Sequence, residues 1–322
     1  MSDTAPPPLI LGLAGWRCRL TTDTWDGYER VTQAHAADRV DDAGENMSTL
    51  DVLFQNPQLP RISWSQNGRT GDFAPLFAGP EGKRFLPIAD AERRLYADKV
   101  LGEGAALELS GGEIQVLHPK SWPMYVSHTL TWLMLREHPF VALHAAVCAV
   151  EGVALVIVGP SGCGKSTLSY ALARQGADYF SDESAFLDQR DCGLHVRPQR
   201  ISLRPGGVAA LTAAPNNPRW YESKPNDLKC APLLPVPKAA CPSGRSVLLF
   251  VEGFGNAPRL TPIGGGDAAR RLAFVMGYGD PSPLARLEAA ADVVSRLPCR
   301  TLAIGPPEET AALLVARARE IA

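Results

Sequence analysis

Nine consecutive residues have the composition and spacing of a loop that binds phosphate groups. Residues 159–167 read Gly-Pro-Ser-Gly-Cys-Gly-Lys-Ser-Thr and match the pattern G-x-x-x-x-G-K-[ST] at every defined position. In such loops the glycines let successive backbone N–H groups converge on a phosphate, and the lysine reaches the β- and γ-phosphates. The hydroxyl of the residue after the lysine ligates Mg²⁺. The sequence therefore predicts that this segment binds a nucleoside triphosphate together with Mg²⁺.

An acidic pair follows this loop at the end of a short apolar segment. Asp182 and Glu183 come directly after residues 178–181, Asp-Tyr-Phe-Ser, which we interpret as a strand. Enzymes that transfer phosphoryl groups place a carboxylate at such a strand end, where it holds Mg²⁺ or orients the nucleophile. The alternative interpretation is a solvated pair of carboxylates.

The segments on either side of the loop have the patterns of the strand and the helix that it requires. Val153–Val158 is an apolar run rich in β-branched residues, which is typical of a buried parallel strand. Residues 167–174 carry apolar side chains at helical spacing, and Gly176 follows where a left-handed residue commonly ends a helix. Within this unit we expect the nucleotide to contact Gly159, Ser161, Gly162, Cys163, Gly164, Lys165, Ser166 and Thr167.

The remaining patterns divide the chain into two domains. Residues 1–120 contain short apolar or alternating segments separated by Gly, Pro, Asp and Asn, which indicates a smaller mixed α+β domain with long loops. Residues 121–322 contain the loop, and their apolar runs and helical periodicities indicate an α/β catalytic domain. We expect strands at 9–13, 16–20, 84–88, 106–109, 113–117, 140–150, 246–251 and 300–304, helices at 121–138, 268–276, 284–297 and 307–321, and a loop at 213–229.

The composition is that of an ordinary soluble globular protein. The 322 residues are 45% hydrophobic and 20% charged, and a formal net charge of −2 does not suggest nucleic acid or an anionic membrane as the main partner. The 7 cysteines form no C-x-x-C pair, which argues against a disulfide framework and against a zinc site. The N-terminus lacks the layout of a signal peptide, and no apolar run approaches the roughly 20 residues of a membrane span. We expect a cytoplasmic protein without nucleic-acid or membrane partners.

Segments around the loop carry a family pattern. They are Leu-His-Ala-Ala-Val at 143–147, the loop at 159–166, and Gln-Gly-Ala-Asp-Tyr-Phe-Ser-Asp-Glu at 175–183. At these spacings they resemble the HPr kinase/phosphorylase family, and most closely its divergent HPr kinase-related branch. The resemblance implies a P-loop kinase core of the HPr kinase and phosphoenolpyruvate-carboxykinase type, with a mixed sheet, and an enzyme that uses ATP and Mg²⁺.

By position, the resemblance also implies catalytic roles. Asp182 matches the aspartate that takes the proton from a serine hydroxyl, and Glu183 matches the second acidic residue, which is associated with the metal that Ser166 also ligates. Lys165 would neutralise charge on the transferred phosphoryl group. His144 matches a histidine near the acidic pair, and its alternative role is that of a buried, hydrogen-bonded core residue.

The chain departs from the family at the loop and at the acidic pair. Thr167 stands where HPr kinases usually have Glu, Glu183 stands where they have a second Asp, and the segment that engages HPr is not recognisable. These departures favour an acceptor other than HPr. Related kinases phosphorylate a serine of the precursors of ribosomally made peptides, lasso peptides among them. The resemblance therefore implies a serine kinase that acts on such a peptide or on a protein.

Other functions fit the same residues. The loop and the acidic pair do not identify the acceptor, so a small-molecule hydroxyl kinase and a nucleotide-hydrolysing regulatory switch both remain open. Arg204 and Lys229 either contact phosphate or acceptor or are ordinary solvated side chains. HPr kinases are hexamers, so a homo-oligomer is a further implication of the resemblance.

Overall fold

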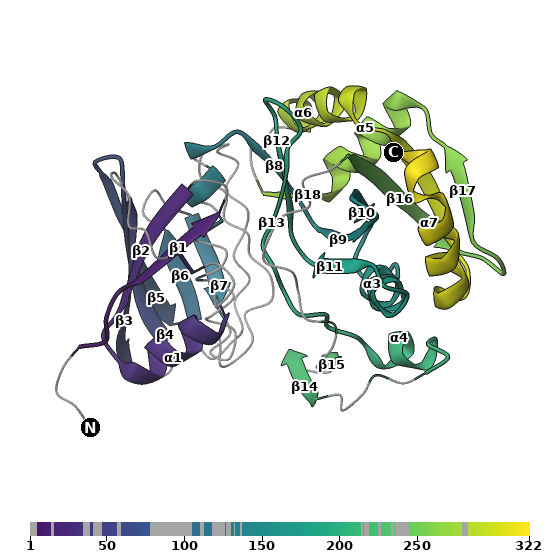
Figure 1. Cartoon of the computed structure of the whole chain (residues 1–322). Helices are drawn as coiled ribbons and strands as arrows, with labels where there is room; N and C mark the ends of the chain where they lie inside the picture. Colours follow the sequence, from purple (N-terminus) through teal and green to yellow (C-terminus); the bar gives the residue numbers. More distant parts are fainter. Residues whose placement is uncertain are drawn as a thin grey trace. The chain divides into compact units, whose positions relative to one another are not determined.

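The computed structural model describes most of the chain. The described residues are 5–13, 16–34, 39–40, 47–56, 59–77, 105–109, 113–117, 126, 130–131, 133–135, 137–213, 215, 219–224, 227–232, 235, 245–278 and 283–322. The chain divides into two compact units, Met1–His138 and Pro139–Ala322 (Figure 1). The strand expected at 84–88 lies outside the described residues.

The first unit is built on one sheet in which the strands follow their order in the chain, β1 to β7. The pairs are antiparallel except for β2 and β3, which are parallel and are separated in the chain by α1. Trp16, Cys18 and Leu20 of β2 are buried and alternate with more exposed residues, as expected for a sheet with one covered face. The elements are β1 (Leu9–Leu13), β2 (Trp16–Thr22), α1 (Trp25–Ala34), β3 (Ser48–Asn56), β4 (Leu59–Gln66), β5 (Arg69–Phe77), β6 (Ala105–Leu109) and β7 (Glu113–Leu117).

The segment before His138 is attached to this first unit, although the sequence places the domain boundary at 120. Nε2 of Gln66 donates a hydrogen bond to the carbonyl oxygen of Leu133 at 2.6 Å, and Nδ2 of Asn67 donates to Oε1 of Glu137 at 3.2 Å. Leu133 is itself fully buried. These contacts explain why the compact units divide between 138 and 139.

The second unit contains a six-stranded sheet in the order β11-β9-β10-β16-β19-β17. Its strands are β9 (Ala145–Val150), β10 (Val153–Val158), β11 (Asp178–Ser181), β16 (Ser246–Phe254), β17 (Arg259–Pro262) and β19 (Cys299–Ile304). The neighbours β10, β16 and β19 are parallel, whereas β9 runs antiparallel to both β10 and β11. The carboxyl ends of β10, β11, β16 and β19 therefore meet at one edge, together with the amino end of β9.

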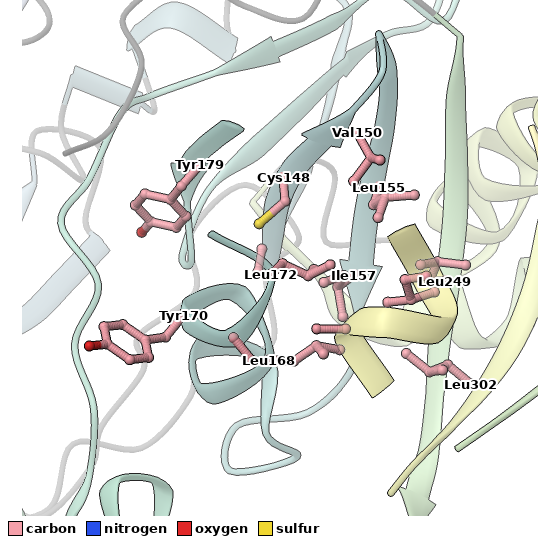
Figure 2. Close-up of a cluster of buried hydrophobic side chains, with 14 of the residues drawn as sticks. Cys148, Val150, Leu155, Ile157, Leu168, Tyr170, Leu172, Tyr179, Leu249 and Leu302 are labelled. Carbon is pink, nitrogen blue, oxygen red and sulfur yellow. The ribbon is translucent and has the colours of Figure 1, made fainter. Parts of the chain in front are cut away.

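Helices cover both faces of this sheet, because the strands are apolar on both sides. On one face α3 (Lys165–Arg174) and α7 (Pro307–Ile321) share a core cluster with the sheet, and Figure 2 shows Leu172 of α3 beside Ile157 of β10. On the other face the cluster includes Leu272 of α5 (Gly265–Val275) and Val293 of α6 (Pro283–Arg296). Each fully buried leucine of this kind contributes about 1.5–3 kcal/mol. The α/β class predicted from the sequence is confirmed.

A smaller sheet shares the hydrophobic cluster that contains Leu272 of α5 and Val293 of α6. Its order is β13-β12-β8-β18, with β8 (Phe140–Leu143), β12 (Ala185–Asp188), β13 (Leu194–Val196) and β18 (Met276–Tyr278). The single strand predicted at 140–150 is therefore wrong. The chain leaves one sheet after Leu143 and enters the other at Ala145, and the intervening His144 donates its backbone N–H to Val275 at 3.3 Å.

The loop predicted at 213–229 is also wrong in part. Its second half forms a hairpin of β14 (Arg219–Lys224) and β15 (Asp227–Ala231). Cys230 of β15 exchanges two backbone hydrogen bonds with Leu203, at 2.9 and 2.7 Å. The hairpin is thereby fixed next to Arg204 and the short helix α4 (Pro205–Ala209).

Candidate active site

The phosphate-binding loop connects β10 to α3 at the sheet edge where the parallel strands end. Gly162 and Gly164 have φ angles of 86° and 95°, a left-handed conformation that glycine adopts without steric cost. The helix begins at Lys165, two residues earlier than the sequence predicts, so Ser166 and Thr167 lie in its first turn. The backbone N–H groups at this helix start, and the positive end of the helix dipole, favour an anion such as phosphate.

Lys165 is buried, with 5% of its surface exposed, and it folds back over its own loop. Its Nζ donates hydrogen bonds to the carbonyl oxygens of Gly159 at 2.7 Å and Pro160 at 3.1 Å. Burial lowers the pKa of the Lys165 ammonium, and the charges of Cys163, Glu183 and Asp182 oppose this shift. A desolvated cation in this position is a strong partner for a phosphate.

Asp182 is a buried carboxyl group in contact with the loop. It is 3% exposed, and its Oδ2 accepts a hydrogen bond from the backbone N–H of Ser202 at 3.2 Å. Its Oδ1 is 3.4 Å from the hydroxyl of Tyr179, which donates to it. Burial and then the neighbouring Glu183 raise the pKa of Asp182 to about 6, while Ser166, Ser202 and Lys229 act to lower it. The carboxylate is therefore ionised at neutral pH and still basic enough to accept a proton.

Glu183 lies at the more open side of the same turn. Ser181 Oγ accepts hydrogen bonds from the backbone N–H groups of Glu183 and Ser184, both at 3.2 Å, and thereby fixes the turn after β11. Nδ1 of His144 is 3.3 Å from Oε2 of Glu183. Burial acts to raise the pKa of Glu183, but the hydrogen bond and charge of His144, followed by Lys229 and Lys165, lower it below its ordinary value. Glu183 is thus an ionised carboxylate at neutral pH.

Strand direction explains why residues so far apart in the sequence meet here. In the β9–β10 pairing Ala145 is opposite Val158, so His144 is next to the start of the loop. Because β11 also ends at this edge, Asp182 and Glu183 follow on the other side of β9. The structure therefore brings together the three segments that the family pattern contains.

A cavity of ≈ 420 Å³ opens over these groups. Its volume is in the range of about 300–1,000 Å³ that small-molecule sites have. Of the nucleotide contacts expected from the sequence, Ser161, Gly162, Gly164, Lys165, Ser166 and Thr167 line it, together with His144, Asp182 and Glu183. Gly159 and Cys163 do not. Gly159 instead binds Lys165 through its carbonyl oxygen, and a Cβ atom on Gly159 would lie 2.7 Å from Sγ of Cys163.

Two basic side chains that the sequence left open also line the cavity, Arg204 and Lys229. Nη1 of Arg204 lies 3.7 Å from the position of a Cβ atom on Gly162, which places the guanidinium over the loop. The charge of Lys229 acts on the pKa values of both Asp182 and Glu183. With Lys165, the side chains of Arg204 and Lys229 therefore make three cations in the lining of the cavity where phosphate groups would bind.

Further lining residues come from segments that the sequence gave no reason to connect with the loop. They are Ser202, Gly206, Gly207, Ala210, Phe254, Ile304, Gly305 and Pro307. Ile304 and Pro307 follow the loop by more than a hundred residues and belong to β19 and α7. Only the parallel arrangement of β10, β16 and β19 brings them to the same edge, and no local motif marks them.

The chain shows a distant similarity to a known protein. No family model matches the chain. Over 86 residues the chain is 30% identical to HPr kinase/phosphorylase 1 of Oceanobacillus iheyensis, a stretch that covers 27% of each protein. The relationship to an HPr kinase is distant. The chain thus spans about a quarter of the length of this curated relative.

The residues near the loop fit the Mg²⁺ that an HPr kinase-like site implies. Mg²⁺ prefers oxygen ligands and typically binds through one or two carboxylates, its remaining positions being taken by substrate phosphates and water. The Ser166 hydroxyl and the carboxylate of Glu183, both in the cavity lining, supply such oxygens. In the described part of the chain, no group of three or more His, Cys, Asp or Glu side chains forms a metal cage. The donor set suits a metal that arrives with the nucleotide.

The described helices contain no segment long and apolar enough to cross a membrane.

Proposed function

We propose that this protein is a kinase that transfers the γ-phosphoryl group of ATP to a serine hydroxyl of a peptide or protein. The observation that carries this proposal is the position of Asp182, a buried carboxylate that lines the same cavity as Lys165 and Ser166 of the phosphate-binding loop. The distant similarity to an HPr kinase supports the same reaction class. We also propose that the second unit has the P-loop kinase core of that family.

In the proposed reaction the loop with Lys165, the carboxylate of Asp182, and the pair Ser166 and Glu183 each have a separate role. The loop N–H groups and Lys165, released from the carbonyl oxygens of Gly159 and Pro160, bind the phosphates. Asp182 takes the proton of the acceptor hydroxyl as the acceptor oxygen bonds to the γ-phosphorus. The bond between this phosphorus and the β–γ bridging oxygen breaks, and ADP leaves with that oxygen. Bound Mg²⁺, held by Ser166 and Glu183, would neutralise charge on the phosphates.

His144 positions Glu183 in this proposal, and it does not touch the reacting atoms. Its Nδ1 holds the carboxylate through the 3.3 Å contact and keeps it ionised. Arg204 and Lys229 add positive charge to the cavity lining, where they would attract the phosphates or an acidic acceptor. We propose a precursor of a ribosomally made peptide, of the lasso type, as the acceptor, and the cytoplasm as its location.

The test is to supply ATP labelled on the γ-phosphate together with sets of peptides that differ by Ser, Thr or Ala at one position. The proposal predicts label in the serine peptides, located on that residue by mass spectrometry, and none in the alanine peptides. Label in a small-molecule hydroxyl compound, with peptides untouched, would contradict the peptide acceptor. Label that appears only as free phosphate would contradict the kinase and favour a nucleotide-hydrolysing switch.

A further inference from the structure

The cavity is charged at one end and apolar at the other. His144, Asp182 and Glu183 line it where β9 and β11 meet the edge, whereas Phe254 and Ile304 line it at the ends of β16 and β19. In the sheet order β11-β9-β10-β16-β19 these two groups are on opposite sides of β10. The phosphate-binding loop starts at the end of β10, so it lies between the charged end and the apolar end.

Phe254 is the most unusual residue of the apolar end. It is 71% exposed, although Val251 on the same strand is only 8% exposed. The register between β16 and β19 shifts between Val251 and Gly253, and Gly253 has a φ angle of 148°, which re-aims the end of the strand. The strand end is fixed all the same, since Gly255 donates its N–H to the carbonyl oxygen of Ile304 at 2.7 Å.

The ring of Phe254 is in contact with the loop. Its Cε1 lies 3.1 Å from the position that a Cβ atom on Gly164 would occupy, and Cδ1 of Ile304 lies 3.4 Å from the same position. The edge of the ring therefore lies over the last glycine before Lys165, and the residue forms part of the cavity lining. A planar aromatic ring in the cavity lining, directly beside the loop, offers a face on which another flat ring can stack.

We propose that Phe254 is the surface on which the aromatic base of the nucleoside triphosphate stacks, with Ile304 and Pro307 completing an apolar base pocket. This inference rests on the proposed function and adds the direction in which the nucleotide lies. The base is at the ends of β16 and β19, the phosphates follow the loop, and the γ-phosphate is at Asp182 and Glu183. Stacking uses the face that every base possesses, so Phe254 serves ATP and GTP alike.

The test separates the base from the phosphates by using two probes, ATP and inorganic tripolyphosphate, both with Mg²⁺, in calorimetric titrations of the whole chain. Phe254→Ala should weaken ATP binding about tenfold, the size expected for one stacked base, and leave tripolyphosphate binding unchanged. Phe254→Trp should retain ATP binding. Phe274→Ala is the matched control, because Phe274 is an 80% exposed phenylalanine of α5 that does not line the cavity, and it should behave as the wild type.

Two results would overturn the stacking role of Phe254 and leave the proposed kinase function standing. Phe254→Ala could bind ATP as tightly as the Phe274→Ala control, or it could lose ATP and tripolyphosphate in parallel. In either case the ring does not contact a base, and the exposed phenylalanine serves another partner. A wild-type protein that binds neither probe would overturn the proposed function as well, because the loop itself would then have no phosphate to hold.

Discussion

Nδ1 of His144 and Oε2 of Glu183 lie 3.3 Å apart at the mouth of the cavity. The two residues belong to segments almost forty positions apart, and they meet because β9 runs antiparallel to β10 and β11. Both side chains are partly exposed, at 37% and 46%, and ion pairs of this kind contribute about 0–1 kcal/mol to stability. The pair therefore matters for the ionisation and orientation of Glu183 more than for folding.

Replacing His144 should weaken the use of Mg²⁺. In His144→Ala the pKa of Glu183 loses its main lowering influence, so burial raises it and the carboxyl group becomes a poorer ligand. We expect the Mg²⁺ concentration for half-maximal activity to rise about tenfold, the cost of losing a residue that orients a metal ligand. His195→Ala, whose ring packs against Phe140, is the control. An unchanged Mg²⁺ requirement in His144→Ala would show that the contact has no positioning role.

The rate of transfer should fall as the pH drops through about 6. Asp182 must be deprotonated to accept the hydroxyl proton, and its pKa is raised to about 6 by burial and by Glu183. Below that pH the rate should decrease about tenfold for each pH unit. The pKa of Glu183 is lowered, so Glu183 stays ionised in this range. A pH–rate profile that stays flat down to pH 4, as for a solvated aspartate, would contradict the role of Asp182.

Asp182→Asn should stabilise the fold while it removes the base. A carboxyl whose pKa is raised on folding binds its proton more tightly in the native state, so the stability of the wild type falls as the pH rises from about 4 to about 6. Above that window the ionised Asp182 costs up to about 3 kcal/mol, which asparagine avoids. Urea unfolding should show the variant more stable at pH 8 and the difference shrinking towards pH 4. A variant that is less stable than the wild type at every pH would contradict this account of the charge.

Gly305 should tolerate no side chain. A Cβ atom there would lie 2.6 Å from the backbone nitrogen of Pro258 and 2.8 Å from the carbonyl carbon of Ala257, and backbone atoms cannot move aside. We expect Gly305→Ala to lower the free energy of unfolding by about 1–3 kcal/mol and to weaken ATP binding. Gly266→Ala in α5 has no heavy atom within 4 Å of the new methyl group and should stabilise by about 0.5–1 kcal/mol. Similar effects of the two changes in thermal unfolding would refute the steric argument.

Local patterns were sufficient to predict the strand, the loop and the helix of the proposed phosphate site. The glycine spacing, the apolar run of β10 and the periodicity of α3 each depend on neighbouring residues, so the sequence alone indicates them. The interruption at His144 could not be predicted in this way, because residues 140–150 are apolar almost throughout and both sheets bury them. The apolar end of the cavity was missed for a different reason. Phe254 and Ile304 approach Gly164 only through the pairing of distant parallel strands.

The burial of Asp182 is likewise a property of the folded chain. In the sequence it is one of two adjacent acidic residues, and nothing local separates their roles. The structure separates them through Ser202, which bonds Asp182 from a later segment, and through His144, which contacts Glu183. Two neighbouring carboxyl groups thereby acquire pKa values shifted in opposite directions.

The most direct test of the proposed reaction is a single-turnover transfer from ATP to a serine peptide, with ATP affinity measured on the same proteins. The variants are Asp182→Asn and, as the matched control, Asp178→Asn, an exposed aspartate at the start of β11, the strand that Asp182 follows. We predict that Asp182→Asn binds ATP within about twofold of the wild type and transfers phosphate at least about a hundredfold more slowly, while Asp178→Asn is normal. Transfer at the wild-type rate by Asp182→Asn, or loss of ATP binding with normal turnover of the remaining complex, would contradict the assignment of Asp182 as the base.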